Sequence, residues 1–261
     1  MWMTLFRKEW RETRTVFFIL QGVFTFLYLL IWFSLTQNSG WAFLLMFVVA
    51  AAHVLYLFIA WLWSLQGEWR SRTHWTWLNL PVPGWKLITS KLAAVFSQYL
   101  LSLAYAMAAG WFSLRLFLEQ FPAVLPVDEL DRSLLSFYES ASPWIYLLMT
   151  HLSLQFGFAV VLLYLLFKAF RFLGAAAGVL LIIGWNYLTS AAEGVFQLLQ
   201  FGEIVNLSEL FYRTFSLPPG RMMADGTENL ILYAGDTLFY LVFYAVLLAV
   251  FHYLIDRKIE A

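Results

Sequence analysis

The sequence contains no cysteine and little charge: only 12% of its 261 residues are Asp, Glu, Lys or Arg. The missing cysteine excludes disulfide bonds and every metal or redox site built from thiolates. Soluble domains carry roughly 25% charged and about 45–50% apolar residues, whereas 62% of this chain is hydrophobic and 20% is aromatic. A soluble core could not hide this excess, so the composition indicates an integral membrane protein. The net charge of zero gives no reason to expect nucleic acid as a partner.

Motifs of catalysis are missing as well. There is no GxxxxGK[ST] for binding nucleotide phosphates, no HExxH and no GxSxG. The four histidines do not pair at i, i+4, so we expect no metal site, no catalytic residue and no cofactor held by this chain. His53 lies inside an apolar run, where an ionisable residue is either functional or a neutral group bonded to a neighbouring helix. We favour the neutral group.

Six continuous apolar runs are long enough to be membrane helices. A run of about 20 residues at 1.5 Å per residue crosses the hydrocarbon layer of about 30 Å. The runs do not alternate polar and apolar residues, which excludes membrane strands. The first run is also too long for a cleavable signal peptide. We therefore predict an all-α, single transmembrane domain over 1–261, with spans at 16–36, 41–65, 87–118, 144–167, 172–191 and 230–255.

The distribution of lysine and arginine sets the expected orientation, because these residues are enriched in cytoplasmic segments. With the N-terminus inside, 12 of the 16 lie in cytoplasmic segments and only Arg115, Arg132, Arg213 and Arg221 lie outside. We therefore expect a multi-pass protein of a bacterial cytoplasmic membrane with both termini inside. The outer segments are 119–143, with one short helix, and 193–229. The second is apolar enough for one or two short helices, either dipping into the membrane or lying on its outer surface.

The N-terminal segment 1–15 has the pattern of an amphipathic helix. Its aromatic residues Trp2, Phe6 and Trp10 share one face with Leu5. Basic residues occupy the remainder: Arg7, Lys8, Arg11 and Arg14. We predict a helix that lies on the membrane surface and leads into the first span. The alternative is a positively charged flank that only orients that span.

The longest polar interruption in the first half of the chain is 66–91, QGEWRSRTHWTWLNLPVPGWKLITSK. Tryptophans at 69, 75, 77 and 85 alternate there with charged residues, a pattern typical of the membrane–water boundary. Pro81, Pro83 and Gly84 predict a turn in the middle. We expect a short cytoplasmic interfacial helix, a turn, and the start of the next span.

A GxxxG pattern, Gly174 to Gly178, lies in the fifth run. Small residues at this spacing let helices approach closely, so we predict a helix-packing contact there, although the pattern is also frequent by chance. Arg115 and Glu119 are four residues apart and predict a local ion pair.

The helix LFRKEWRETR, the six spans and the segment from Glu68 to LNLPVPGWKLITSK together resemble the permease subunits of ABC-2 type transporters. In that family a glutamate ends the second span and an L-x-S-L-P-V-S/T-R…I…x-K stretch enters the third. Asn79 stands where a serine is usual, and Gly84-Trp85 replaces the usual basic residue. The matching positions are Leu78, Leu80, Pro81, Val82, Ile88 and Lys91.

The resemblance implies an N-terminal elbow helix, a coupling helix between spans two and three, and extracellular helices between spans five and six. It also implies separate ATPase subunits that hold ATP and Mg²⁺, a second permease chain, identical or paralogous, and contact with membrane lipids. The function it implies is export of an amphipathic or hydrophobic substrate such as a peptide, an antibiotic or a lipid. The residues expected to transmit the stroke of the ATPase are Glu68, Arg70, Arg72, Trp75, Trp77, Leu80 and Pro81.

Glu68 has a simpler interpretation, a carboxylate that caps a helix end or pairs with Arg72 at the membrane edge. Two other functions stay open for the chain. It could be a membrane-embedded enzyme acting on lipids or peptides, which would need more convergent polar groups than the spans contain, or a structural or sensory membrane protein.

Overall fold

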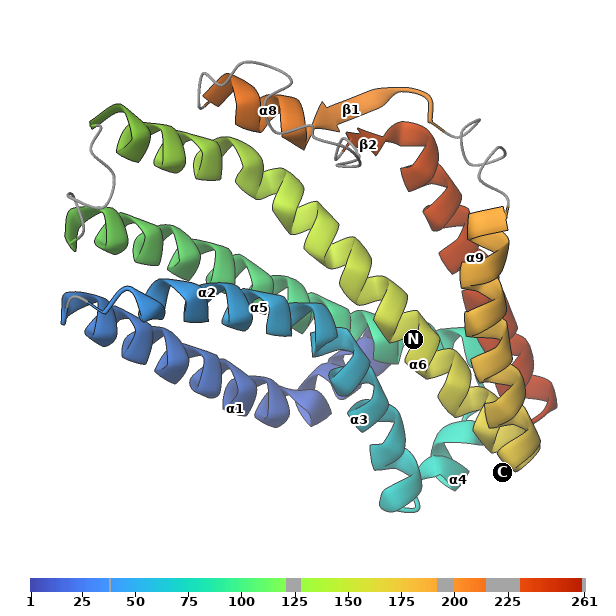
Figure 1. Ribbon diagram of the computed structural model, residues 1–261. Coiled ribbons are helices and arrows are strands. Elements are labelled where there is room, and N and C mark those ends of the chain that lie inside the picture. Colours follow the sequence, from blue (N-terminus) through green and yellow to red (C-terminus); the bar gives the residue numbers. More distant parts are fainter. Residues whose placement is uncertain (38, 121–127, 192–199, 215–230, 260–261) are drawn as a thin grey trace.

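The fold is seen in a computed structural model that describes residues 1–37, 39–120, 128–191, 200–214 and 231–259. This part of the chain is almost entirely helical, in agreement with the predicted class (Figure 1). Its elements in chain order are α1 (Trp2–Thr36), α2 (Trp41–Ala52), the 3₁₀ turn η1 (His53–Leu55), α3 (Tyr56–Arg70), α4 (His74–Leu78), α5 (Gly84–Gln120), α6 (Asp128–Ala191), β1 (Glu203–Asn206), α8 (Leu207–Thr214), β2 (Ile231–Tyr233) and α9 (Ala234–Arg257).

Five described helical segments are long and apolar enough to cross a membrane, which makes the chain a candidate multi-pass membrane protein. They are Trp2–Thr36, Leu44–Arg70, Gly84–Gln120, Ser133–Phe170 and Ala234–Arg257. The predicted span 172–191 is helical too, as the last part of α6. Several of its side chains lie outside the described set, so it is not among the five.

Helix α6 reverses direction near its residue 170, as Figure 1 shows at the lower right. A Cβ atom added at Gly178 would lie 2.7 Å from the Leu163 side chain, whereas residues 15 apart in a straight helix are separated by about 22 Å. One added at Gly174 would meet the carbonyl group of Leu166. The chain therefore folds back tightly, and both predicted packing glycines lie at the inside of this fold.

Helices α1 and α5 run parallel along their whole length. The Trp2 indole donates to Thr89 Oγ1 (3.0 Å) near the start of both helices, and the Trp32 indole donates to Ser113 Oγ (2.8 Å) near their ends. The predicted surface helix 1–15 is thus continuous with the first span in α1. Three of its side chains, those of Trp2, Glu9 and Thr13, bond to α5.

The second span is broken in the middle by η1. The His53 ring Nδ1 lies 3.0 Å from the carbonyl oxygen of Val49 and so donates to it, while Nε2 lies 3.3 Å from Ser102 Oγ. The side chain is fully buried and stacks on Phe24. The Ser102 contact joins the second span to α5, which agrees with the favoured interpretation of His53 as a contact between helices.

The largest apolar core lies where α3, α5, α6 and α9 meet. Trp61 is 2% exposed and contacts Phe158 edge to face, while its indole donates to the carbonyl oxygen of Leu92 (3.1 Å). Phe158 also stacks on Tyr244 and Phe251 of α9. This core fixes α3 and the start of α5 relative to each other.

Two helix boundaries differ from the expected ones. No helix boundary lies at Pro143, because α6 runs from Asp128 straight through it. Tyr138 donates to the carbonyl oxygen of Met107 (2.6 Å) and holds this extension against α5. The start of the predicted sixth span is not helical: β2 pairs antiparallel with β1 of the predicted outer segment, and α9 begins only at Ala234. Between positions 200 and 214 the one helix is α8.

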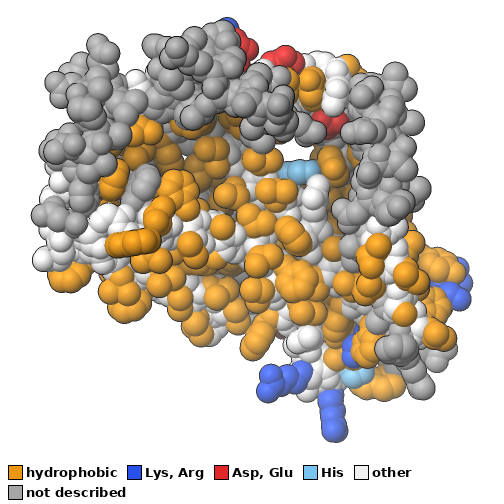
Figure 2. Space-filling model, viewed as in Figure 1, with side chains coloured by type: hydrophobic (Ala, Val, Ile, Leu, Met, Phe, Trp, Pro, Cys, Tyr) orange, Lys and Arg blue, Asp and Glu red, His pale blue; other side chains and the backbone are white. Residues whose placement is uncertain are grey.

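The predicted cytoplasmic segments gather at one end of the molecule. Asp256, near the end of α9, accepts a bond from the backbone N–H of Gly84 at the start of α5 (2.9 Å). Lys168, at the reversal of α6, lies over the Trp69 ring of α3 (5.1 Å). Most of the visible lysines and arginines lie at this end in Figure 2, and hydrophobic side chains cover the middle.

Candidate functional site

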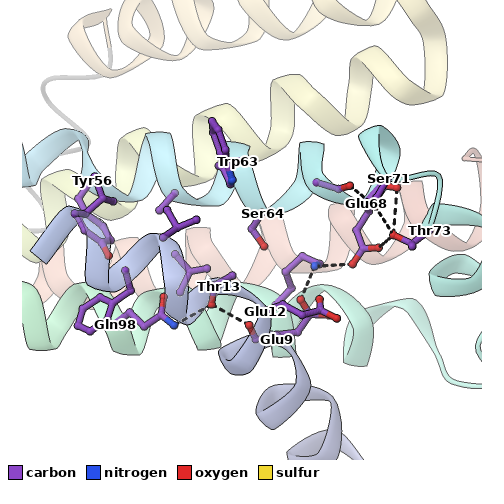
Figure 3. A pocket seen from close by; sticks show the side chains of 17 residues that line it. Glu9, Glu12, Thr13, Tyr56, Trp63, Ser64, Glu68, Ser71, Thr73 and Gln98 are labelled. Atoms are coloured by element: carbon purple, nitrogen blue, oxygen red, sulfur yellow. Dashed lines mark hydrogen bonds and ion pairs between the residues drawn. The ribbon is translucent and has the colours of Figure 1, made fainter. Parts of the chain in front are cut away.

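A buried group of charged residues joins three of the candidate spans at the end that holds these segments (Figure 3). The Lys91 ammonium of α5 contacts the Glu9 carboxylate of α1 and lies 3.0 Å from Glu68 Oε1 of α3. Glu9, Lys91 and Glu68 are 1%, 2% and 5% exposed. We call these three residues the charge cluster.

The charge cluster is completed by neutral and exposed partners. Thr73 Oγ1 donates to Glu68 Oε2 (2.6 Å). The half-exposed Lys8 ammonium lies 3.3 Å from Glu9 and 3.8 Å from Glu68. Each buried carboxylate therefore faces at least one cation, which is the condition under which buried charge is tolerated.

Carboxyl oxygens of Glu9, Glu12 and Glu68 lie within 4.8 Å of one another, close enough to be considered as metal ligands. The Lys91 ammonium already bonds to two of the three. Because this cation supplies the charge that a metal ion would bring, the arrangement suits an internal salt bridge better than a metal centre.

The chain places Glu68 by ending α3 sharply. Ser71 Oγ donates to the carbonyl oxygen of Gly67 (2.6 Å), and Arg72 adopts a positive φ of 59°, which is uncommon outside glycine. The chain then turns back and brings Thr73 to the Glu68 carboxylate. The pair between Glu68 and Arg72 is replaced by these contacts, since Glu68 pairs with Lys8 and Lys91 in the described part of the chain.

Of the residues predicted to couple to a partner, some are exposed and some are not. Arg70, Arg72, Trp75 and Pro81 are exposed, whereas Leu80 is half-buried. Trp77 is 2% exposed and its ring lies 5.6 Å from the Lys91 ammonium. Trp77 therefore belongs to the core behind the charge cluster and is not available as an anchor for another protein.

The residues predicted for the N-terminal interfacial helix lie on two faces of α1. Trp2 stacks on Phe6, and Phe6 contacts Trp10 at 6.1 Å between ring centroids, so the aromatic row exists. Basic residues on the other face are exposed: Arg7, Lys8 and Arg11. The prediction missed Glu9, which shares the buried side with Leu5, Phe6 and Thr13.

A cavity of about 670 Å³ opens between α6 and α9, at the end of the molecule opposite the charge cluster. His151, at its wall, has both ring nitrogens engaged, with Gln155 at 2.8 Å and the Tyr244 hydroxyl at 3.3 Å. The contact with Tyr244 joins α6 to α9 at this wall of the cavity.

Comparison with protein-family models, with curated proteins and with solved structures found no match for this chain.

Proposed function

We propose that this chain is the membrane-spanning permease subunit of an ABC transporter in a bacterial cytoplasmic membrane. In this proposal 172–191 is a sixth span and both termini are cytoplasmic. The substrate is amphipathic or hydrophobic and is exported, and ATP is hydrolysed with Mg²⁺ on separate subunits. A second permease chain completes the transport path.

The observation that carries the proposal is the position of the charge cluster behind the exposed segment 70–76. A permease without a nucleotide site must receive the motion of its ATPase through a cytoplasmic surface. Here the segment that ends α3 is connected by Glu68 to Lys91 of α5 and through it to Glu9 of α1. A push on that segment would move three candidate spans together, because buried hydrogen-bonded ion pairs resist separation.

The surface of this segment also suits a partner groove. Trp75 is 53% exposed in the short helix α4 and is preceded in the chain by the exposed Arg70 and Arg72. Exposed tryptophan and arginine are the residues that most often dominate binding at protein interfaces. Trp85, the second residue of α5, is also exposed, at 44%.

The test is co-purification with an ATPase encoded beside this gene, followed by ATP hydrolysis in lipid. We expect Trp75→Ala to weaken co-purification about tenfold or more, as for an interface anchor. Trp41→Ala is the matched control, since Trp41 is 77% exposed at the other end of the molecule. Glu68→Gln should leave assembly intact and reduce transport per ATP hydrolysed.

Equal effects of Trp75→Ala and Trp41→Ala would contradict a docking role for 70–76. If no neighbouring ATPase associates with the wild-type chain, the structural or sensory alternative becomes the better hypothesis.

A further inference from the structure

A cavity of about 290 Å³ lies between α1, α3 and α5, directly beside the charge cluster. Figure 3 shows its labelled residues coming from these helices and the turn after α3. Its volume corresponds to about ten water molecules. That is room for the head of a lipid-sized molecule.

The walls separate into a polar and an apolar end. The polar end contains the charge cluster with Glu12, Thr13, Ser64 and Gln98, and the Gln98 amide donates to Thr13 Oγ1 (2.9 Å). The apolar end is lined by Val16, Phe17, Leu20, Tyr56, Ala60 and Val95. Such a division is complementary to an amphiphile with a small head and a hydrocarbon tail.

One wall residue has an unused polar group. Ser64 is 8% exposed, and its hydroxyl has no hydrogen-bond partner among the described residues. Figure 3 shows this hydroxyl pointing from α3 into the space between Thr13 and the charge cluster. Because an unsatisfied buried hydroxyl is costly, the group indicates that something polar fills this end of the cavity.

The charge at the polar end is negative. Glu9, Glu12 and Glu68 contribute three negative charges, and Lys8 and Lys91 contribute two positive ones, which leaves a net charge of −1. The carboxylate of Glu12 is paired only with the exposed Lys8 within the described chain. One additional cation would neutralise the site, and an anion would be repelled by it.

We propose that this cavity binds the ammonium head of an amphiphilic amine, with the tail lying between α1 and α3. The ammonium donates to Glu12 and to the Ser64 hydroxyl, and the tail contacts the apolar end. The head could belong to an aminophospholipid of the membrane or to a free long-chain amine. This binding is independent of the proposed transport function, since it needs no ATPase.

Gly67 provides a way to block the cavity without disturbing the fold. It lines the cavity, and a Cβ atom added there would have nothing within 4 Å. Gly67→Leu therefore places a side chain at the opening while improving helix propensity. Gly22→Leu is a matched control, because Gly22 is also helical and open but does not line the cavity.

The experiment is native mass spectrometry of the full-length, delipidated protein in detergent, titrated separately with phosphatidylethanolamine, phosphatidylglycerol and dodecylamine. We expect an amine probe to bind and phosphatidylglycerol to remain at background. Glu12→Gln should weaken amine binding about tenfold, the factor of one ordinary charge-assisted hydrogen bond. Gly67→Leu should reduce amine binding to the level of phosphatidylglycerol, because its side chain fills the space. Gly22→Leu should bind like the wild type.

Binding of phosphatidylethanolamine identifies a lipid head as the ligand, and binding of dodecylamine alone identifies a free amphiphilic amine; both support the proposal. Equal binding of phosphatidylglycerol, or wild-type binding by Gly67→Leu, would show unspecific lipid contact and overturn it. If no amine binds, the cavity holds water only and the proposal is wrong.

Discussion

Replacing Lys91 by methionine removes the cation that two buried carboxylates share. Methionine has a similar length, so the change leaves little empty space in the core. Glu9 and Glu68 would then face each other at 1% and 5% exposure, with only the half-exposed Lys8 near both. The variant thus isolates the electrostatic contribution of the charge cluster.

The size of the effect follows from the burial. Removing one partner of a buried ion pair costs about 3–5 kcal/mol, because the remaining charge is left without compensation. Lys8 and the Thr73 hydroxyl still bond to the carboxylates, so we expect a loss near the lower limit, about 3 kcal/mol. If the carboxylates are also neutralised, in Glu9→Gln/Glu68→Gln/Lys91→Met, most of this loss should be recovered.

The assay is reversible unfolding in mixed micelles, which gives the free energy of unfolding of each variant. Arg115→Met is the control, since its ion pair with Glu119 (3.1 Å) is more than half exposed on both sides and is worth about 0–1 kcal/mol. A Lys91→Met variant as stable as this control would refute the argument that the charge cluster holds α1, α3 and α5 together. A triple variant no more stable than Lys91→Met would show that lost packing, not charge, causes the effect.

Two further predictions concern packing and orientation. Gly178→Leu should broaden the size-exclusion profile or lower the yield of folded protein, because even its Cβ atom would lie 2.7 Å from Leu163. Val179→Leu, at a position 46% exposed, should resemble the wild type. Equal size-exclusion profiles of the two variants would show that the close contact at Gly178 is not needed. In intact cells an impermeant thiol reagent should label Ser140→Cys and should not label Ser71→Cys; labelling of position 71 would contradict the cytoplasmic assignment of 66–91, and the chain offers no competing cysteine.

The long helices could be predicted from the sequence because hydrophobicity alone sets them: continuous apolar runs have one solution in a bilayer. The interruptions and extensions of these helices could not be predicted from the sequence. The turn at η1 depends on His53 bonding to the Val49 carbonyl and to Ser102 of another helix. The extension of α6 before Pro143 depends on Tyr138 finding a carbonyl on α5. Both are tertiary contacts that local patterns do not contain.

The burial of Trp77 and the role of Glu9 at the charge cluster could also have been predicted from the sequence. Trp75 and Trp77 are two residues apart, so on a helix they do not share a face, and one exposed and one buried ring is the natural outcome. Glu9 is the single acidic residue on the apolar side of a basic helix, next to Leu5 and Phe6. An unpaired charge at such a position indicates a buried partner. That the partner is Lys91, 82 residues away, follows only from the parallel packing of α1 and α5.

The central claim, that 70–76 is the surface through which an ATPase acts on the charge cluster, is tested most directly by photocrosslinking in membranes. A photoreactive phenylalanine analogue replaces Trp75 in the full chain, co-expressed with the neighbouring ATPase, and Trp41 carries it in the control. We predict a crosslinked product with the ATPase from position 75 and none from position 41. Absence of the product at position 75, with both proteins present in the membrane, would contradict the account.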